Sequence, residues 1–130
     1  MQLYIITHKA MNNKNTISRL SKSFALRIIK LYKFLLEEKH EYIMSKQVYR
    51  SGTSIRANIA ESRNAQSHAD YINKLNIALK EADGTMYWLE LLHESETIDD
   101  QQFDSISNDL NIIIGTLINI IKKLRESAER

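Results

Sequence analysis

The amino-acid sequence predicts an all-α protein built as an antiparallel up-down-up-down four-helix bundle. The 130 residues include no proline and only three glycines, so few residues would interrupt a helix. Apolar residues recur at intervals of three and four along four segments, which is the spacing of one helix face. The joints between these segments are short, and short joints place consecutive helices side by side and antiparallel.

Length and composition limit the class of protein. A chain of 130 residues is one domain by size and can bury one core. It has no cysteine, which excludes disulfides, thiol catalysis and cysteine-bound zinc and favours a cytoplasmic location. No apolar run approaches the roughly 20 residues of a membrane span, so we expect no membrane partner.

The first predicted helix covers residues 17–38, with Thr16 as its N-cap. Its apolar face contains Ile17, Leu20, Phe24, Ile28, Leu31 and Leu35. Residues 1–15 precede this helix, and we expect them to be an N-terminal arm, either disordered or an early-start extension. Residues 16–130 then form the four-helix bundle domain.

The second predicted helix covers residues 45–63 and has a glycine, Gly52, in its apolar face. A glycine costs about 1 kcal/mol of helix stability relative to alanine, so a close helix crossing is the expected reason for it. Ser54 and Asn58 lie beside the same face. We assign these three residues to helix packing, with a ligand contact as the alternative for Ser54 and Asn58.

The third predicted helix covers residues 69–93. Ser67 precedes it as an N-cap, and Asp70 follows three residues later, as in a capping box. Trp88 is interpreted as a large packing residue at a helix or subunit contact, with a base-stacking platform as the alternative.

The fourth predicted helix covers residues 100–126, with Thr97 or Asp99 as its cap. A heptad seam of apolar residues runs from Phe103 to Leu124. Further isoleucines widen the apolar surface beyond this seam, at Ile112, Ile114, Ile118 and Ile121. A helix that is apolar on more than one side is buried on more than one side, which predicts contact with another subunit through these isoleucines and Trp88.

Five short segments in the middle of the chain occur in a recognisable order and spacing. They are RSGTSI at 50–55, ANIAE at 57–61, AQS at 65–67, IALKEA at 77–82 and YWL at 87–89. Together they resemble the bacterial four helix bundle protein family, also called the 23S rRNA-intervening-sequence protein family, over about Ser21 to Leu124. The chain differs from the family pattern at Arg56, where relatives commonly have glycine or proline.

The resemblance implies an antiparallel four-helix bundle that assembles as a ring, typically a homopentamer. It implies no catalytic residues, because the family has none that are accepted. A related protein, the accessory variability determinant of diversity-generating retroelements, is a basic ring that binds nucleic acid and a reverse transcriptase.

Charge is distributed unevenly along the chain. The first 65 residues carry 12 lysines and arginines against 4 aspartates and glutamates, whereas the last 65 carry 6 against 12. This polarity predicts either a basic face for a polyanion or charge matching between subunits. The nucleic-acid-binding candidates are Arg19, Lys22, Arg27, Lys30, Lys33, Arg50, Arg56 and Arg63. Binding through them would be mostly to phosphates and strongly salt-dependent.

Catalytic and metal-binding patterns are weak. Two Glu-x-x-His spacings occur, Glu37 with His40 and Glu90 with His93, as in di-iron bundles. The remaining helices offer no matching carboxylates inside the bundle at that end, and no serine has a nearby His–Asp arrangement. We therefore expect no enzyme activity, no cofactor and no metal.

These observations lead to two hypotheses for a cytoplasmic homo-oligomer, expected to be a pentamer. The first is a module that either binds nucleic acid or acts like a chaperone. Its expected partner is RNA or a nucleic-acid-processing protein. The alternative is a protein-binding scaffold or assembly factor with no nucleic-acid role, in which the oppositely charged halves serve assembly.

Overall fold

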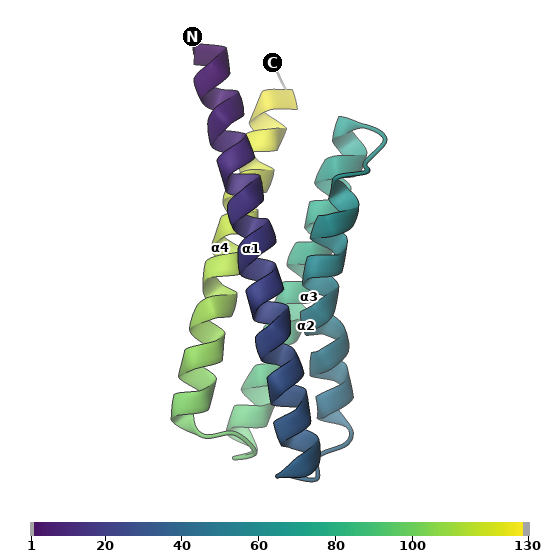
Figure 1. Cartoon of the computed structure of the whole chain (residues 1–130), viewed down its shortest axis with the longest axis vertical. Coiled ribbons are helices and arrows are strands. Elements are labelled where there is room, and N and C mark those ends of the chain that lie inside the picture. Colours follow the sequence, from purple (N-terminus) through teal and green to yellow (C-terminus); the bar gives the residue numbers. More distant parts are fainter. Residues whose placement is uncertain (1, 129–130) are drawn as a thin grey trace.

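The computed structural model describes the backbone of residues 2–128 and the side chains of residues 16–127. It contains four helices, α1 (Gln2–Glu37), α2 (Met44–Ser62), α3 (His68–Glu94) and α4 (Asp100–Ala128). Each helix packs against the next and α4 packs against α1, while the backbones of diagonally placed helices lie further apart within the described residues. The start of α1, the end of α4 and the α2–α3 joint lie at one end of the bundle (Figure 1). The predicted up-down-up-down bundle is confirmed.

The first helix is longer than predicted. Helix α1 begins at Gln2, so Thr16 lies inside it and the prediction of Thr16 as an N-cap is wrong. Residues 2–16 contain neither glycine nor proline, and nothing in them interrupts the helix. The first turns of α1 extend past the end of α4 in Figure 1. The side chains of residues 1–15 lie outside the described part of the chain, and the N-terminal arm stays a prediction.

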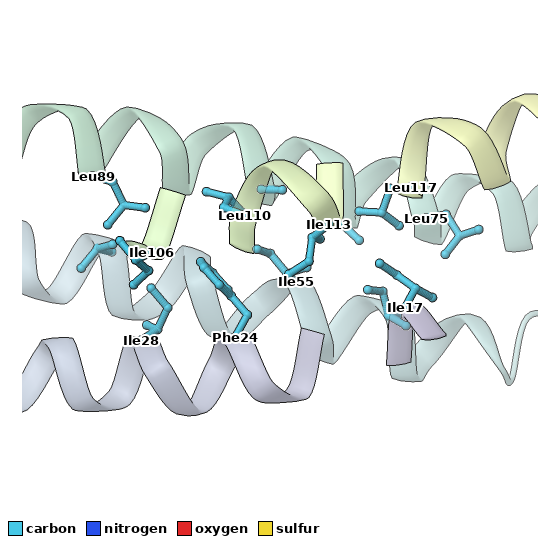
Figure 2. Close-up of a cluster of buried hydrophobic side chains, with 14 of the residues drawn as sticks. Ile17, Phe24, Ile28, Ile55, Leu75, Leu89, Ile106, Leu110, Ile113 and Leu117 are labelled. Atoms are coloured by element: carbon cyan, nitrogen blue, oxygen red, sulfur yellow. The ribbon is translucent and has the colours of Figure 1, made fainter. Parts of the chain in front are cut away.

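Side chains from all four helices form the core. Phe24 and Ile28 of α1, Ile55 of α2, Leu89 of α3 and Leu110 of α4 are each no more than 1% exposed. Figure 2 shows them pointing into the space between the helices. Burying a side chain of this size stabilises the fold by roughly 1.5–3 kcal/mol, so these layers hold the helices together. None of the described helices has a stretch long and apolar enough to pass through a bilayer.

Helices α1 and α2 approach closely at Gly52. A Cβ atom added there would lie 2.7 Å from Cγ1 and 3.0 Å from Cγ2 of Ile28. Ile28 is fully buried, and a branched side chain in a helix has few alternative rotamers. The absence of a side chain at position 52 therefore sets how near the two helices can come.

Polar side chains define the beginning of α3 and α4. The Ser67 hydroxyl accepts a hydrogen bond from the Asp70 amide at 3.0 Å, and the Asp70 carboxylate accepts one from the Gln66 amide at 3.2 Å. At α4, Asp99 accepts from the Gln102 amide at 2.7 Å, and the Gln102 side chain accepts from the Asp99 amide at 2.9 Å. Of the two candidate caps, the structure uses Asp99, in a reciprocal capping box.

The beginning of α2 is capped by a carboxylate from the preceding joint. Glu41 accepts hydrogen bonds from the amides of Ile43 at 2.6 Å, Met44 at 2.7 Å and Ser45 at 3.2 Å. These amides have no partner within the helix, and a negative charge beside them also interacts favourably with the helix dipole. The sequence analysis did not identify this cap.

We expect Gly52→Ala to destabilise the fold even though alanine is the better helix former. The new methyl overlaps Ile28, and overpacking of a well-filled core costs about 1–3 kcal/mol, against a gain of about 1 kcal/mol in helix propensity. Urea unfolding monitored by circular dichroism measures the difference.

Gly84→Ala is the matched control, because no atom lies within 4 Å of its added Cβ. It should be neutral or stabilise by up to about 1 kcal/mol. In an Ile28→Ala background the cost of Gly52→Ala should disappear. Equal behaviour of Gly52→Ala and Gly84→Ala in the wild-type background would contradict this account of the crossing.

Candidate nucleic-acid interface

Helices α1 and α2 lie side by side (Figure 1). Their exposed lysines and arginines form a basic surface. Five of the predicted nucleic-acid-binding residues on it are exposed, and their side chains form no hydrogen bond or ion pair with any described residue. They are Arg19, Lys22, Lys30, Lys33 and Arg50. We refer to the surface made by these five residues, together with Arg56 and Arg63, as the basic face.

Almost no negative charge lies within the basic face. Residues 16–36 contain five lysines and arginines, residues 42–60 contain three, and neither segment contains an aspartate or glutamate. The carboxylate of Glu41 caps α2, and that of Glu61 lies 3.5 Å from the ammonium of Lys74 on α3. Glu37 ends α1 four residues after Lys33, but no described carboxylate forms an ion pair with a residue of the basic face.

Arg27 differs from the other candidates because its guanidinium joins α1 to α4. Its Nη1 donates to the Asp109 carboxylate at 2.6 Å and to the Ser105 carbonyl at 3.1 Å, and its Nη2 donates to the Ser105 hydroxyl at 2.8 Å. These contacts place the guanidinium at the α1–α4 boundary. Arg27 acts as a link between helices in this structure, and three of its guanidinium hydrogen bonds are made to α4.

Arg56 and Arg63 lie on the flank of α2 that faces α1. Nη2 of Arg63 donates to the hydroxyl of Ser18 on α1 at 3.0 Å. Nη1 of Arg56 is buried and has no hydrogen-bond partner among the described residues. Arg63 is exposed and Arg56 is half-buried, so the basic face continues along the α1–α2 boundary.

Two tyrosines lie on the same boundary. The rings of Tyr32 on α1 and Tyr49 on α2 are 4.7 Å apart between centroids, with their planes at 46°. Tyr49 is 39% exposed, and Tyr42 in the α1–α2 joint is 55% exposed. The sequence analysis did not identify Tyr32 or Tyr49 as candidate site residues. A signal for Tyr49 was present, because Tyr49, Arg56 and Arg63 are spaced by seven and that spacing places them on one flank of a helix.

A cavity of about 310 Å³ opens where the bundle ends near Arg63. Its apolar lining comes from all four helices, through Ile17, Ile59, Leu75 and Ile120. Its polar lining comes from Ser18, Ser62, Arg63 and Tyr71. The cavity thus joins the bundle interior to one end of the basic face.

The predicted helix-packing residues have different roles. Gly52 lies at the α1–α2 crossing, whereas Ser54 donates to the Arg50 carbonyl at 2.6 Å and Asn58 donates to the Ser54 carbonyl at 2.8 Å, both within α2. The polar contact between helices comes instead from the buried hydroxyls of Ser51 and Thr85, 2.9 Å apart.

The predicted subunit-contact residues divide into surface and core positions. Ile112 is 54% exposed and Ile118 is 49% exposed, on the outer side of α4. Ile114 and Trp88 are half-buried against the core. The rings of Trp88 and Tyr87 meet edge-on, with 5.1 Å between their centroids. Ile121 is 4% exposed, which leaves little of its side chain for a second subunit.

Among the described residues, His68 and His93 contact polar groups elsewhere in the chain. Nε2 of His93 lies 2.6 Å from the Asp100 carboxylate, and the His93 ring stacks on Phe103 at 4.4 Å. Nε2 of His68 lies 2.9 Å from the Leu124 carbonyl. Within the described residues there is no group of three or more His, Asp or Glu side chains that could hold a metal ion.

The comparisons with known proteins agree with the motifs in the middle of the chain. The family model of the 23S rRNA-intervening sequence protein matches residues 13–119. The chain belongs to this family. The match to the 23S rRNA-intervening sequence protein family spans most of α1, all of α2 and α3 and two-thirds of α4, so it includes the whole basic face.

A solved structure supports the family assignment. The crystal structure of a protein of unknown function from the S23 ribosomal protein family of Bacteroides thetaiotaomicron VPI-5482 is 57% identical to the chain, with a TM-score of 0.84. The match covers 85% of this chain and 98% of that one. No curated protein matches the chain.

We expect the contact between Arg27 and Asp109 to stabilise the bundle measurably. Both side chains are partly exposed, at 36% and 47%, so the pair should contribute about 0.5–1 kcal/mol. A double-mutant cycle of Arg27→Ala and Asp109→Ala, measured by urea unfolding, gives the coupling energy. Arg19→Ala is the control and should change stability by less than about 0.5 kcal/mol. A coupling energy of zero would show that the ion pair contributes nothing in solution.

Proposed function

We propose that this member of the 23S rRNA-intervening sequence protein family is a non-enzymatic nucleic-acid-binding module, and that RNA is its ligand. The observation that carries the proposal is the basic face, where five exposed cationic side chains on two adjacent helices have no partner among the described residues. Repeated phosphates are a chemical partner for such a surface, because each cation can neutralise one of them.

The shape of the basic face also favours an extended polyanion. Arg19 and Lys33 are separated by 14 residues of one helix, which is about 21 Å along its axis. A small anion would contact one or two of these side chains, whereas a nucleic-acid backbone can contact them in succession. The family's description refers to an rRNA intervening sequence, which makes RNA the first ligand to test.

The proposal predicts steep salt dependence. Five phosphate contacts correspond to a slope of roughly −3.5 to −4.5 in log affinity against log salt concentration. We expect the triple variant Lys22→Glu, Lys30→Glu, Lys33→Glu to bind RNA at least roughly ten-fold more weakly than wild type and to lower the magnitude of this slope by about 2 to 3. Fluorescence anisotropy with a structured RNA at two salt concentrations measures both quantities.

A matched control variant carries the same change of charge on the other two helices. Lys80 of α3 and Lys122 and Lys123 of α4 are exposed, and their replacement by glutamate should leave RNA affinity nearly unchanged. Circular dichroism of both variants verifies the fold. Absence of salt-sensitive RNA binding by the wild type at micromolar protein, or equal losses in the two variants, would refute the proposal.

A second candidate function is a self-assembling scaffold, and the outer side of α4 favours it. Ile112 and Ile118 are each about half exposed there, and Gly115 lies between them with no atom within 4 Å of its added Cβ. A second copy of the chain is the occupant that we propose for this surface, in a ring such as a pentamer. The excess of acid in the second half of the chain would complement the basic half of a neighbouring copy.

We expect Ile118→Asp to reduce self-association, because a carboxylate in an apolar contact loses its hydration. Sedimentation velocity compares its oligomeric state with that of the wild type. Leu26→Asp is the control, since Leu26 is 55% exposed but lies on α1. A wild-type protein that sediments as a monomer at high concentration would rule out the ring.

A further inference from the structure

The tyrosine pair at the α1–α2 boundary coincides with the basic face. Tyr49 is 39% exposed and stands beside Tyr32, with 4.7 Å between ring centroids. Lys33 follows Tyr32 directly in α1, and Arg50 follows Tyr49 directly in α2. Both of these cations are exposed and form no ion pair with described residues. Each ring of the pair is thus followed in sequence by an exposed cation of its own helix.

The pair also lies in line with two further cations. Tyr49 and Arg56 of α2 and Arg63, the C-cap residue of that helix, recur every seven residues, a spacing of about 10.5 Å along the axis that returns to the same flank within about 20°. Tyr49 contacts Tyr32 and Arg63 reaches Ser18 across the boundary, so this flank faces α1 at both of its ends. A strand lying along the boundary would therefore meet an aromatic ring, then the half-buried Arg56 and then the exposed Arg63.

This combination distinguishes between forms of RNA. In a duplex the bases are stacked and paired, so a protein surface meets mainly phosphate and sugar, for which lysine and arginine suffice. An exposed aromatic ring among those cations adds an interaction only with a base that is unpaired. We propose that Tyr49, supported by Tyr32, is a stacking platform for an unpaired base, and that the basic face selects single-stranded RNA. This inference rests on the proposed RNA-binding function.

Another exposed tyrosine provides a contrast within the molecule. Tyr87 on α3 is 55% exposed and contacts Trp88, so it is as accessible as Tyr49. It lies in the half of the chain where acidic residues outnumber basic ones by two to one. Aromatic exposure alone therefore does not define the proposed site, whereas aromatic exposure within the basic face does.

The test compares one RNA strand of about 12 nucleotides, without self-complementarity, with the same strand annealed to its complement. Wild type should bind the single strand more tightly than the duplex. Tyr49→Leu should weaken single-strand binding by roughly 5- to 100-fold, the effect of losing one base–aromatic stack, and Tyr49→Phe should retain it. Duplex affinity and the salt slope should stay unchanged in both variants, because the phosphate contacts remain.

Tyr87→Leu is the matched control and should bind both RNAs as the wild type does.

A second measurement uses the unaltered protein, in case Tyr49→Leu does not fold. Ultraviolet cross-linking of the single-strand complex, followed by trypsin digestion and mass spectrometry, should label the peptide of residues 47–50, which lies between the cleavage sites at Lys46 and Arg50. Equal affinity for both RNAs with no effect of Tyr49→Leu, or cross-links only elsewhere, would overturn this inference while leaving RNA binding intact. No binding of either RNA would instead refute the proposed function itself.

Discussion

The arrangement of this bundle depends on the close approach of α1 and α2 at Gly52. Because the buried Ile28 occupies the space that a side chain at position 52 would need, the distance between these two helices is set by the absence of a Cβ atom. Two structural consequences follow. Tyr32 and Tyr49 come into ring contact, and Arg63 reaches Ser18. The basic face is continuous because the helices that carry it are held this near to one another.

Much of the fold could be predicted because it depends on periodicity. The apolar spacing locates α2, α3 and α4 to within two residues, and Ser67 and Asp99 act as caps through contacts of three residues or fewer in sequence. The beginning of α1 could not be predicted in this way, since Thr16 has the chemistry of a cap but the residues before it also permit a helix. Glu41 was missed for a related reason. It caps α2 from within the joint, and the conformation of that joint is set by tertiary packing.

The candidate site could be predicted only in part. The sequence shows which residues are charged, but only the fold shows which groups those residues contact. Arg27 and Lys30 are three residues apart on one helix, yet Arg27 bonds to Asp109 and Ser105 while Lys30 has no partner among the described residues. The separation of 82 residues between Arg27 and Asp109 hides that contact from any local pattern. In the same way, Ser51 and Thr85 form the buried polar contact between α2 and α3, whereas Ser54 and Asn58 bond within their own helix.

The charge distribution leaves most cations of the basic face without an ion-pair partner among the described side chains. The chain as a whole carries a net charge of only +2, so acidic groups are numerous enough to neutralise most of the lysines and arginines. Few of them do so across helices: the described side chains form one such pair between α1 and α4, at Arg27 and Asp109, and one between α2 and α3, at Lys74 and Glu61. The other cations on α1 and α2 repel one another at short range, since residues 16–36 contain no carboxylate. A polyanion would relieve this repulsion. A second copy with its acidic half opposed would relieve it as well, so the proposed RNA binding and the proposed self-assembly would draw on the same electrostatic driving force.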